Sequence, residues 1–450
     1  MKQANIVIVG GSAAGPVAAM TAKRHYPDKS VLEIRKEKPE RVMVPCGVPY
    51  IFGTVGSTDK NVIPDAIVTN NGAELMIDEV TAIDRAAKTV TTAGGESISY
   101  DKLVLATGSN PVSPPIPGKE LENVFFVKKD ADYIDEMQKK LADAKDIIVI
   151  GGGFIGVEMA DEIQKMSGKN VTIVEMLPHC LQLALDEDQC VEAEKKLGER
   201  GIKVLTNAAA KNIAGENGKV SAVELGSGES LKADAVIIGI GAVPNTELAQ
   251  KAGLEIGPMR GIQVDEYMRS VTDENVFVAG DCADKFSFFT KKPSGLRLAS
   301  IAGIEAHIAG ANLFQLKRKN EGAIGVFATI IGNDCFSVAG LTEKAATEAG
   351  YDIVIGESTA PDTHPGGMPG SKPEKIKLIV DKKSGKVLGG EMIGGKTAAE
   401  VANIMSAFIS NGMTADQVAT FQMGTQPALT ASPIVYQLVN AAELAITKMN

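Results

Sequence analysis

The sequence has few cysteines, and none of them is paired in a short motif. They stand at positions 46, 180, 190, 282 and 335, an odd and widely spaced set without any C-x-x-C. This pattern argues against a secreted disulfide framework and against a structural zinc site. Since the four histidines are also scattered, we predict no metal site and a reducing, cytoplasmic environment.

Runs of basic residues and long apolar segments are also lacking. Lysine and arginine number 46 against 56 acidic residues, which leaves a formal net charge of −10. Nucleic acid is a poor partner for such a chain, because phosphate backbones are bound through clustered positive charge. No apolar run approaches the roughly 18 residues of a membrane helix, and the N-terminal MKQANIVIVGG runs into a glycine turn rather than a cleavage site. We expect a soluble, unprocessed protein that avoids membranes.

The chain is long and contains many glycines. Its 450 residues exceed the roughly 250 to 300 that one hydrophobic core supports, so two or three domains are expected. The 47 glycines indicate many tight turns and close backbone approaches.

A predicted strand, a glycine turn and a predicted helix open the chain. β-branched residues fill 5–9, and GGSAAG follows from Gly10 to Gly15, with Ser12 at the middle glycine position of the dinucleotide motif G-x-G-x-x-G. Glu33 comes 23 residues after Gly10, near the spacing at which a carboxylate reaches a ribose hydroxyl. The helix N-terminus would offer N–H groups to a diphosphate. A turn that binds no ligand is the alternative.

The same pattern returns in complete form in the middle of the chain. An apolar strand over 147–150 leads into Gly151, Gly153 and Gly156 and then into helix-forming residues. Glu175 follows Gly151 by 24 residues and would accept the 2′-hydroxyl of an adenosine ribose. A 2′-phosphate would be repelled there, and no arginine follows within MLPHCLQ, so the sequence favours NADH over NADPH.

Two further buried strands fit an FAD architecture. DKLVLATG ends in Thr107 and Gly108, and ENVFVAGD ends in Gly280 and Asp281. Small residues at the carboxyl edge of a sheet let a ligand approach the backbone, and Asp281 could accept a hydrogen bond from a sugar alcohol.

On these residues the chain resembles the pyridine nucleotide-disulfide oxidoreductase family, in the single-cysteine branch that includes coenzyme A disulfide reductases, NADH oxidases and persulfide reductases. The resemblance covers nearly all of the chain. It implies an α/β fold with two Rossmann-like dinucleotide-binding domains and a C-terminal α+β dimerisation domain. By analogy, FAD binding is expected at 1–115 and 245–325, NAD binding at 116–244, and the interface of a homodimer at 326–450.

The resemblance also implies a role for the cysteine in RVMVPCGVPYIFG. The branch carries its redox cysteine in Cys-Gly-Leu-Pro-Tyr, and CGVPY, from Cys46, differs only by valine for leucine. A helix is expected to begin near Gly47, with N–H groups that stabilise the thiolate. Because no second cysteine is near, the sulfur of Cys46 would form its mixed disulfide, persulfide or sulfenate with a group from solution. A buried structural cysteine is the alternative.

The predicted catalytic residue is therefore Cys46. In relatives, an aromatic residue at the position of Phe154 gates the nicotinamide pocket, although packing alone would explain this residue about as well. Glu158 lies one helical turn further on and is expected to face the same pocket. The predicted cofactor-binding residues are Gly10, Ser12, Ala13, Ala14, Gly15, Glu33, Arg35, Thr107, Gly108, Gly280, Asp281, Gly151, Gly153, Phe154, Ile155, Gly156, Glu158, Glu175 and Gly241.

The residues and the resemblance leave three activities open. The first is an NADH- and FAD-dependent reductase of coenzyme A disulfide, coenzyme A persulfide or polysulfide. The second is an NADH oxidase, which is disfavoured because Ala13 and Ala14 replace the histidine that peroxide-reducing and many oxygen-reducing relatives carry there. The third is a nucleotide-sensing flavoprotein without turnover. Bound coenzyme A stays open, because VMVP replaces the Ser and Asn that precede the cysteine in relatives, and their tyrosine donors are missing from THPGGMPG and before Ser432.

Overall fold

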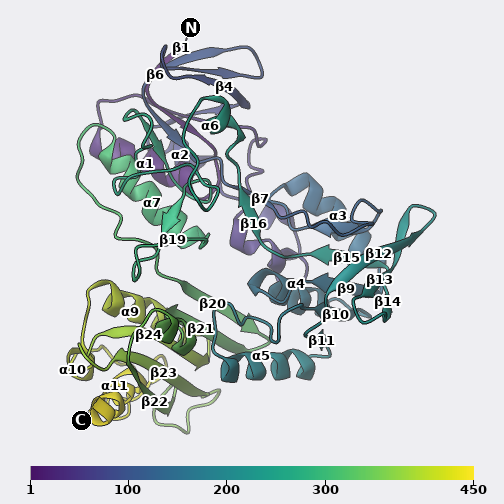
Figure 1. The fold of residues 1–450 in the computed structure, drawn as a ribbon, viewed down its shortest axis with the longest axis vertical. Coiled ribbons are helices and arrows are strands. Elements are labelled where there is room, and N and C mark those ends of the chain that lie inside the picture. Colours follow the sequence, from purple (N-terminus) through teal and green to yellow (C-terminus); the bar gives the residue numbers. More distant parts are fainter. Residues whose placement is uncertain (1, 450) are drawn as a thin grey trace. The chain divides into compact units, whose positions relative to one another are not determined.

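The computed structural model describes residues 2–449. The chain divides into two compact units, which we describe separately (Figure 1). Unit 1 comprises Met1–Pro115, Phe125–Ala144 and Gly239–Ala323, and unit 2 comprises Ile116–Val124, Lys145–Ile238 and Ile324–Asn450.

Unit 1 is built on a seven-stranded sheet with the order β3-β2-β1-β6-β5-β4, in which β17 also pairs with β6. β1, β2, β3, β6 and β17 run parallel, whereas β4 and β5 form an antiparallel extension. The strands are β1 (Lys2–Val9), β2 (Val31–Arg35), β3 (Glu74–Ile77), β4 (Val80–Asp84), β5 (Thr89–Thr92), β6 (Ser97–Leu105) and β17 (Val276–Val278).

Two helices of unit 1 cross closely, α1 (Ala14–His25) and α7 (Ala299–Asn312). α7 carries alanine and glycine on much of its buried surface. An ideal Cβ on Gly310 would lie 2.8 Å from the carbonyl oxygen of Ala18, so a larger residue there would push the helices apart. The small residues of α7 therefore hold it against the helix that begins at the first glycine turn.

The remaining elements of unit 1 are short, except for the 13-residue helix α3. β7 pairs with β16, and β18 pairs with β19. They are β7 (Ser109–Pro111), β16 (Ala242–Pro244), β18 (Lys285–Phe286), β19 (Pro293–Ser294), α2 (Ala66–Thr69), α3 (Ala131–Asp143), α6 (Glu247–Lys251) and the 3-10 helices η1 (Pro45–Gly47), η2 (Pro49–Ile51) and η3 (Thr58–Lys60).

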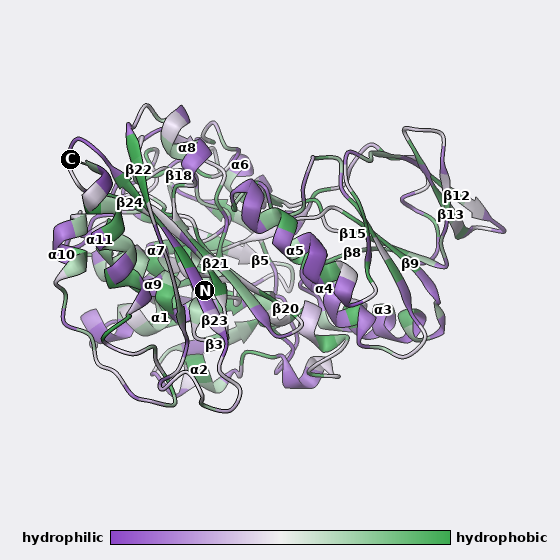
Figure 2. Ribbon diagram, turned by 90° about the horizontal axis from the view of Figure 1, so that it is seen from below, coloured by the Kyte–Doolittle hydropathy of each residue, from purple (hydrophilic) through white to green (hydrophobic). Residues whose placement is uncertain are grey.

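Unit 2 contains a second sheet with parallel strands, of order β11-β10-β9-β15-β8, and the chain leaves the unit within β8. Figure 2 shows the apolar character of β9 and β15, which are almost wholly buried. The elements are β8 (Val124–Phe126), β9 (Asp146–Ile150), α4 (Phe154–Gln164), β10 (Asn170–Val174), α5 (Glu187–Glu199), β11 (Lys203–Leu205), β15 (Ala235–Ile238) and the antiparallel sheet of β12 (Ala210–Glu216), β13 (Lys219–Leu225) and β14 (Ser230–Lys232).

The C-terminal part of unit 2 is an antiparallel sheet of order β20-β21-β24-β23-β22 with helices. Together with the two sheets of parallel strands, it confirms the predicted α/β class. Its elements are β20 (Val326–Ile331), β21 (Asp334–Gly340), α8 (Glu343–Glu348), β22 (Ile353–Pro361), β23 (Pro373–Asp381), β24 (Val387–Gly394), α9 (Ala398–Ser410), α10 (Ala415–Ala419) and α11 (Gln437–Met449).

The compact units do not follow the predicted NAD-binding segment 116–244 throughout. Within that segment, 125–144 and 239–244 belong to unit 1. Arg41 forms ion pairs with Asp132 and Asp135 of α3 at 2.9 and 2.5 Å, and β16 forms a two-stranded sheet with β7. These contacts tie both stretches to the rest of unit 1. Of the helices within residues 2–449, none combines the length and apolar character that crossing a bilayer demands.

Candidate active site

The first glycine turn joins β1 to α1 in unit 1. Gly10 has φ +119°, and an ideal Cβ there would lie 2.2 Å from the carbonyl oxygen of Ala106. An ideal Cβ on Gly15 would lie 1.7 Å from the carbonyl oxygen of Gly10. Both positions therefore require glycine, and the turn that they create presents the N-terminus of a twelve-residue helix, as a diphosphate site needs.

The environment of Glu33 tests whether an FAD ribose fits beside this turn. Glu33 lies on β2 and is 1% exposed, and its Oε2 has no hydrogen-bond partner within residues 2–449. Burial raises the pKa of Glu33 to about 8, although Arg35 acts in the opposite direction. The buried hydroxyl of Ser12 also lacks a partner among those residues. Buried polar groups are normally satisfied, so an acceptor and a hydroxyl of this kind fit a polar ligand such as the FAD ribose and diphosphate.

Arg35 lies beside the same turn. Its guanidinium pairs with Asp65 at 2.5 Å and is 3% exposed, and an ideal Cβ on Gly11 would lie 2.3 Å from its Cδ. Arg35 thus packs its aliphatic part against the glycine turn and directs its charge to Asp65. Its predicted contact with the cofactor stays a prediction.

The two strand ends meet at the carboxyl edge of the unit 1 sheet, since β17 runs parallel to β6. Gly108 and Gly280 have φ +69° and +84°. Asp281 accepts hydrogen bonds from Ser109 at 2.7 Å and from Lys129 at 3.1 Å. Burial alone would raise the pKa of Asp281, but Lys129 and Ser109 outweigh it, so the pKa lies below its usual value and the carboxylate stays charged.

Thr107 is held by a residue that the sequence did not indicate. Its hydroxyl donates to the carbonyl oxygen of Asn245 at 2.7 Å, and the Asn245 amide donates back to the carbonyl oxygen of Thr107 at 2.9 Å. The Asn245 backbone N–H also donates to Gly108 at 2.9 Å. Asn245 therefore fixes the strand end, and the hydroxyl of Thr107 serves the backbone in this arrangement.

A buried ion pair supports Gly280 from behind. Glu305 on α7 accepts the Gly280 N–H at 2.8 Å, and the ammonium of Lys285 donates to the Gly280 carbonyl oxygen at 2.7 Å. Neither residue was predicted for the site. A charged residue 25 positions away on a small-residue helix gives no sequence signal of this kind.

Cys46 lies on η1 in unit 1 and is exposed, whereas the other four cysteines are at most 3% exposed. Burial raises the pKa of the Cys190 and Cys335 thiols to about 12 and about 11, so both remain protonated and weakly nucleophilic near neutral pH.

The expectation of a helix from Gly47 is wrong in its form. The segment makes two three-residue 3-10 helices, η1 and η2, because Pro49 has no N–H to donate to the preceding turn and so interrupts a longer helix. Asn61 organises this loop instead. Its amide donates to the Val44 carbonyl oxygen at 3.1 Å, and an ideal Cβ on Gly47 would lie 1.8 Å from its side-chain oxygen. Glycine beside Cys46 thus leaves room for the side chain of Asn61.

The second glycine turn repeats the first in unit 2. Gly151 has φ +108°, and an ideal Cβ on Gly156 would lie 1.9 Å from the Gly151 carbonyl oxygen. Glu175, 7% exposed, accepts the N–H of Gly152 at 2.5 Å and that of Leu177 at 2.7 Å. The carboxylate is therefore fixed beside the turn, where it would accept a hydrogen bond from an adenosine ribose.

Phe154 and Glu158 lie one helical turn apart on α4, as expected. Both side chains contact β20: the Phe154 ring stacks on Phe327 with centroids 5.0 Å apart, and Glu158 accepts a hydrogen bond from Thr329 at 3.1 Å. Ile155, by contrast, is 37% exposed.

Gly241 is the remaining predicted cofactor-binding residue. It belongs to unit 1, is exposed, and has φ +104° between β15 and β16. Its predicted place among the cofactor-binding residues stays a prediction.

Family models match this architecture. One, described as pyridine nucleotide-disulphide oxidoreductase, covers residues 4–306, and the model of that family's dimerisation domain covers residues 327–433. The chain belongs to this family. The protein is thus an FAD- and NAD(P)H-dependent oxidoreductase, and the predicted fold class, family and cofactors are confirmed.

Individual relatives align with nearly the whole chain of this oxidoreductase. An NADH oxidase of Methanocaldococcus jannaschii is 33% identical over 99% of both chains. An NAD(P)H coenzyme A polysulfide/persulfide reductase of Pyrococcus horikoshii is 31% identical over 91% of this chain and 92% of its own. The solved structure of an NAD-dependent persulfide reductase from A. fulgidus superimposes with a TM-score of 0.90 at 31% identity, over 99% of this chain and 83% of that one.

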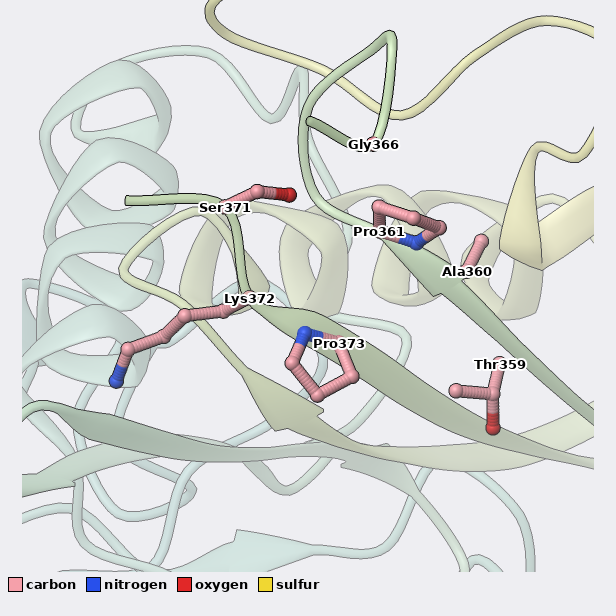
Figure 3. Close-up of a pocket in the computed structure, with 7 residues that line it drawn as sticks. All are labelled: Thr359, Ala360, Pro361, Gly366, Ser371, Lys372 and Pro373. Carbon is pink, nitrogen blue, oxygen red and sulfur yellow. The ribbon is translucent and has the colours of Figure 1, made fainter. Parts of the chain in front are cut away.

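The dimerisation domain of the oxidoreductase carries a pocket where β22 ends and β23 begins (Figure 3). Its one charged side chain, Lys372, donates to the Asn333 carbonyl oxygen at 2.6 Å and to Asp334 at 2.7 Å, so its charge is already paired. The pocket therefore shows no cation ready for a ligand. It is lined by Thr359, Ala360, Pro361, Gly366, Ser371, Lys372 and Pro373.

Proposed function

We propose that the enzyme uses NADH to reduce a small sulfur substrate, a disulfide, persulfide or polysulfide, through Cys46. The observation that carries the proposal is the exposure of Cys46 on a loop of the unit that holds the FAD turn, against the burial of the other four cysteines. The persulfide and polysulfide reductases among its relatives support the same substrate class.

NADH supplies the two electrons that the reduction of a disulfide at Cys46 requires. The Cys46 thiolate attacks one sulfur of RSSR′, a mixed disulfide between Cys46 and RS forms, and R′S⁻ leaves. Two electrons from NADH then cleave the mixed disulfide, which returns the thiolate and releases RS⁻. The sum is NADH + H⁺ + RSSR′ → NAD⁺ + RSH + R′SH, and a persulfide RSSH gives RSH and H₂S in the same way.

FAD, when bound, supplies the two-electron relay between the nicotinamide and the sulfur. The chain's own residues bind and orient the partners. Glu33 and the turn from Gly10 to Gly15 would hold the FAD ribose and diphosphate, and Asp281 would accept a hydrogen bond from its sugar-alcohol chain. Asn61 keeps the Cys46 loop in place.

Glu175 supports NADH as the physiological reductant. Its carboxylate would accept the 2′-hydroxyl of the adenosine ribose and repel a 2′-phosphate. The expected result is a kcat/KM at least tenfold higher with NADH than with NADPH, and equal values would remove this preference.

Anaerobic turnover with NADH tests the proposal. The parent and Cys335→Ala are expected to reduce polysulfide and small disulfides at similar rates, whereas Cys46→Ser retains FAD and is reduced by NADH but loses sulfur turnover. If Cys46→Ser reduces disulfides and polysulfides as fast as the parent, Cys46 is not the nucleophile. Mass spectrometry of the native protein, before and after thiol reduction, would identify an adduct on Cys46 and so test coenzyme A as the bound thiol.

An NADH oxidase is the second candidate, and the 33% identical NADH oxidase supports it. Oxygen uptake as fast as sulfur turnover would promote it. We further propose a cytoplasmic homodimer formed through residues 326–450. A nucleotide sensor without turnover is the remaining alternative, and steady NADH oxidation with any small acceptor would remove it.

A further inference from the structure

Two residues of β20 contact the two α4 residues that face the predicted nicotinamide pocket. Phe154 and Glu158 are four positions apart on the helix and so lie on one face. Phe327 and Thr329 are two positions apart on the strand and so point to the same side. The strand therefore meets the helix through two matched side-chain pairs.

The first pair is an aromatic stack. The rings of Phe154 and Phe327 lie 5.0 Å apart with planes 3° from parallel. An ideal Cβ on Gly325 would lie 2.9 Å from the Phe327 ring, so glycine at this position leaves room for the ring. Phe327 thus offers a flat aromatic surface to Phe154.

The second pair is a hydrogen bond. The hydroxyl of Thr329, a residue that is 4% exposed, donates to Glu158 Oε1 at 3.1 Å. Burial raises the pKa of Glu158 to about 7, the Thr329 hydroxyl lowers it, and Glu162 raises it. A carboxyl with this pKa changes charge in the neutral range, and the strand supplies the group that favours its charged form.

We propose that Phe327 and Thr329 are positioning residues for NADH. Phe327 holds the Phe154 ring out of the predicted nicotinamide pocket, and Thr329 orients the Glu158 carboxyl. The dimerisation domain thereby completes the nicotinamide site of its own chain. The inference rests on the proposed function only in that Phe154 and Glu158 face the nicotinamide.

The glycine turn indicates which arrangement the stack favours. With Phe154 on Phe327, Gly153 is exposed and no atom lies within 4 Å of an ideal Cβ on it. The turn is therefore open at Gly153, the middle glycine of the motif, which allows a close approach to the pyrophosphate. A Phe154 ring freed from Phe327 would sample other rotamers, including ones that obstruct this approach, so NADH binding should weaken.

The charged groups around Glu158 come mainly from α4 itself. Asp161 and Glu162 follow it on the helix, where Lys165 pairs with both and Arg200 also pairs with Asp161. β20, with the sequence VFATII, and β10, with NVTIV, carry no charged residue, and the one on β9 is Asp146 at its start, which pairs with Lys232. Thr329 is thus the neutral donor through which β20 acts on the carboxyl.

Stopped-flow reduction of the bound flavin by NADH, without oxygen or sulfur substrate, tests the stack. Phe327→Leu is expected to raise the apparent Kd for NADH by about two- to tenfold, the range of one aromatic pair. Phe327→Tyr keeps the ring and should retain the parent Kd. An unchanged Kd in Phe327→Leu, or an equal rise in both variants, would overturn the role of Phe327.

The same reaction followed from pH 5 to pH 9 tests the hydrogen bond. Thr329→Val removes the donor and is expected to move the inflection of the parent profile upward by about one pH unit. Thr329→Ser restores a hydroxyl and should restore the profile. If Val and Ser give the same profile, Thr329 has no role in positioning Glu158.

These outcomes are independent of sulfur chemistry. If NADH reduces the flavin but Cys46→Ser leaves sulfur turnover intact, the proposed nucleophile fails while the roles of Phe327 and Thr329 are still measured. If NADH reduces no bound flavin in the parent, the proposed function fails first.

Discussion

Lys285 and Glu305 form an ion pair of 2.9 Å in which both side chains are at most 3% exposed. The pair also binds both backbone polar groups of Gly280, the N–H through Glu305 and the carbonyl through Lys285. Burying two charges is costly unless they are well paired, and here the remaining hydrogen-bonding capacity goes to the strand end that should meet the flavin. The pair therefore ties the core of unit 1 to its predicted cofactor edge.

Removing one charge of this pair should destabilise the fold strongly. Lys285→Met leaves the Glu305 carboxylate buried without its partner, which typically costs about 3 to 5 kcal/mol. The double variant Lys285→Met/Glu305→Leu buries no charge and should recover much of that loss. Urea denaturation of the three proteins checks this, and a double variant that is less stable than Lys285→Met would contradict it.

The second glycine turn offers a matched pair of substitutions. Gly156→Ala places a methyl group where the Gly151 carbonyl oxygen lies, so the turn must distort and flavin reduction by NADH should fall at least tenfold. At Gly153, by contrast, φ is −73° and no atom lies near the position of an added methyl group. The thermal midpoint of Gly153→Ala should therefore stay within about 2 °C of that of the parent. A large loss of stability in Gly153→Ala would show that its surroundings are not open.

The conformation of the Cys46 loop should be sensitive to substitution of Gly47, the residue after the cysteine. Gly47→Ala collides with the side-chain oxygen of Asn61, so the loop must shift, and sulfur turnover should drop by tenfold or more. The FAD content and the rate of flavin reduction by NADH should remain near the parent values, because the glycine turns are untouched. The 450 nm absorbance per chain and the reduction rate measure both. Asn61→Ala, which clears the space, should partly rescue Gly47→Ala.

Stability should fall as pH rises, in part through Glu391. This side chain is fully buried and lies 3.8 Å from Lys377, and burial, aided by Asp186, raises its pKa from 4.5 to about 8. The folded state thus holds a proton that the unfolded chain releases above pH 4.5, so this contribution is present below pH 4.5 and is lost as pH rises through 8.

Glu391→Gln should flatten this dependence. Between pH 5 and pH 8 the parent is expected to lose up to about 1.4 kcal/mol more per pH unit than the variant. Denaturant midpoints at four pH values measure the difference, and the exposed Glu348→Gln is the control. Parallel curves for the parent and Glu391→Gln would contradict the role of Glu391.

The two glycine turns could be predicted from the sequence because their requirements are local. Gly10 and Gly15 in the first turn, like Gly151 and Gly156 in the second, meet within six residues, so the spacing carries the geometry. The acidic residues Glu33, within the second strand of the first unit, and Glu175, after that of the second, follow from the same repeating unit. Parallel strands and their connecting helices therefore emerged with the correct class.

The supporting residues could not be predicted, because each acts across a long stretch of chain. Asn61 reaches Gly47, Glu305 reaches Gly280, and Phe327 reaches Phe154 from another domain. A hydrophobic or charged residue on a strand or helix looks ordinary until its tertiary partner is known. The expected helix after Cys46 does not form for a local reason, since Pro49 interrupts its backbone hydrogen bonds.

The pairing of β17 with β6 has a consequence for synthesis on the ribosome. β6 ends at Leu105, yet β17, which pairs in parallel with its last three residues, begins only at Val276. β5 covers only Ser97–Ser99 on that edge, so until β17 is made the end of β6 lacks a neighbour there and is a template for intermolecular association. Fragments that stop between these two strands should precipitate in the cell, and chaperones should be needed most during that interval.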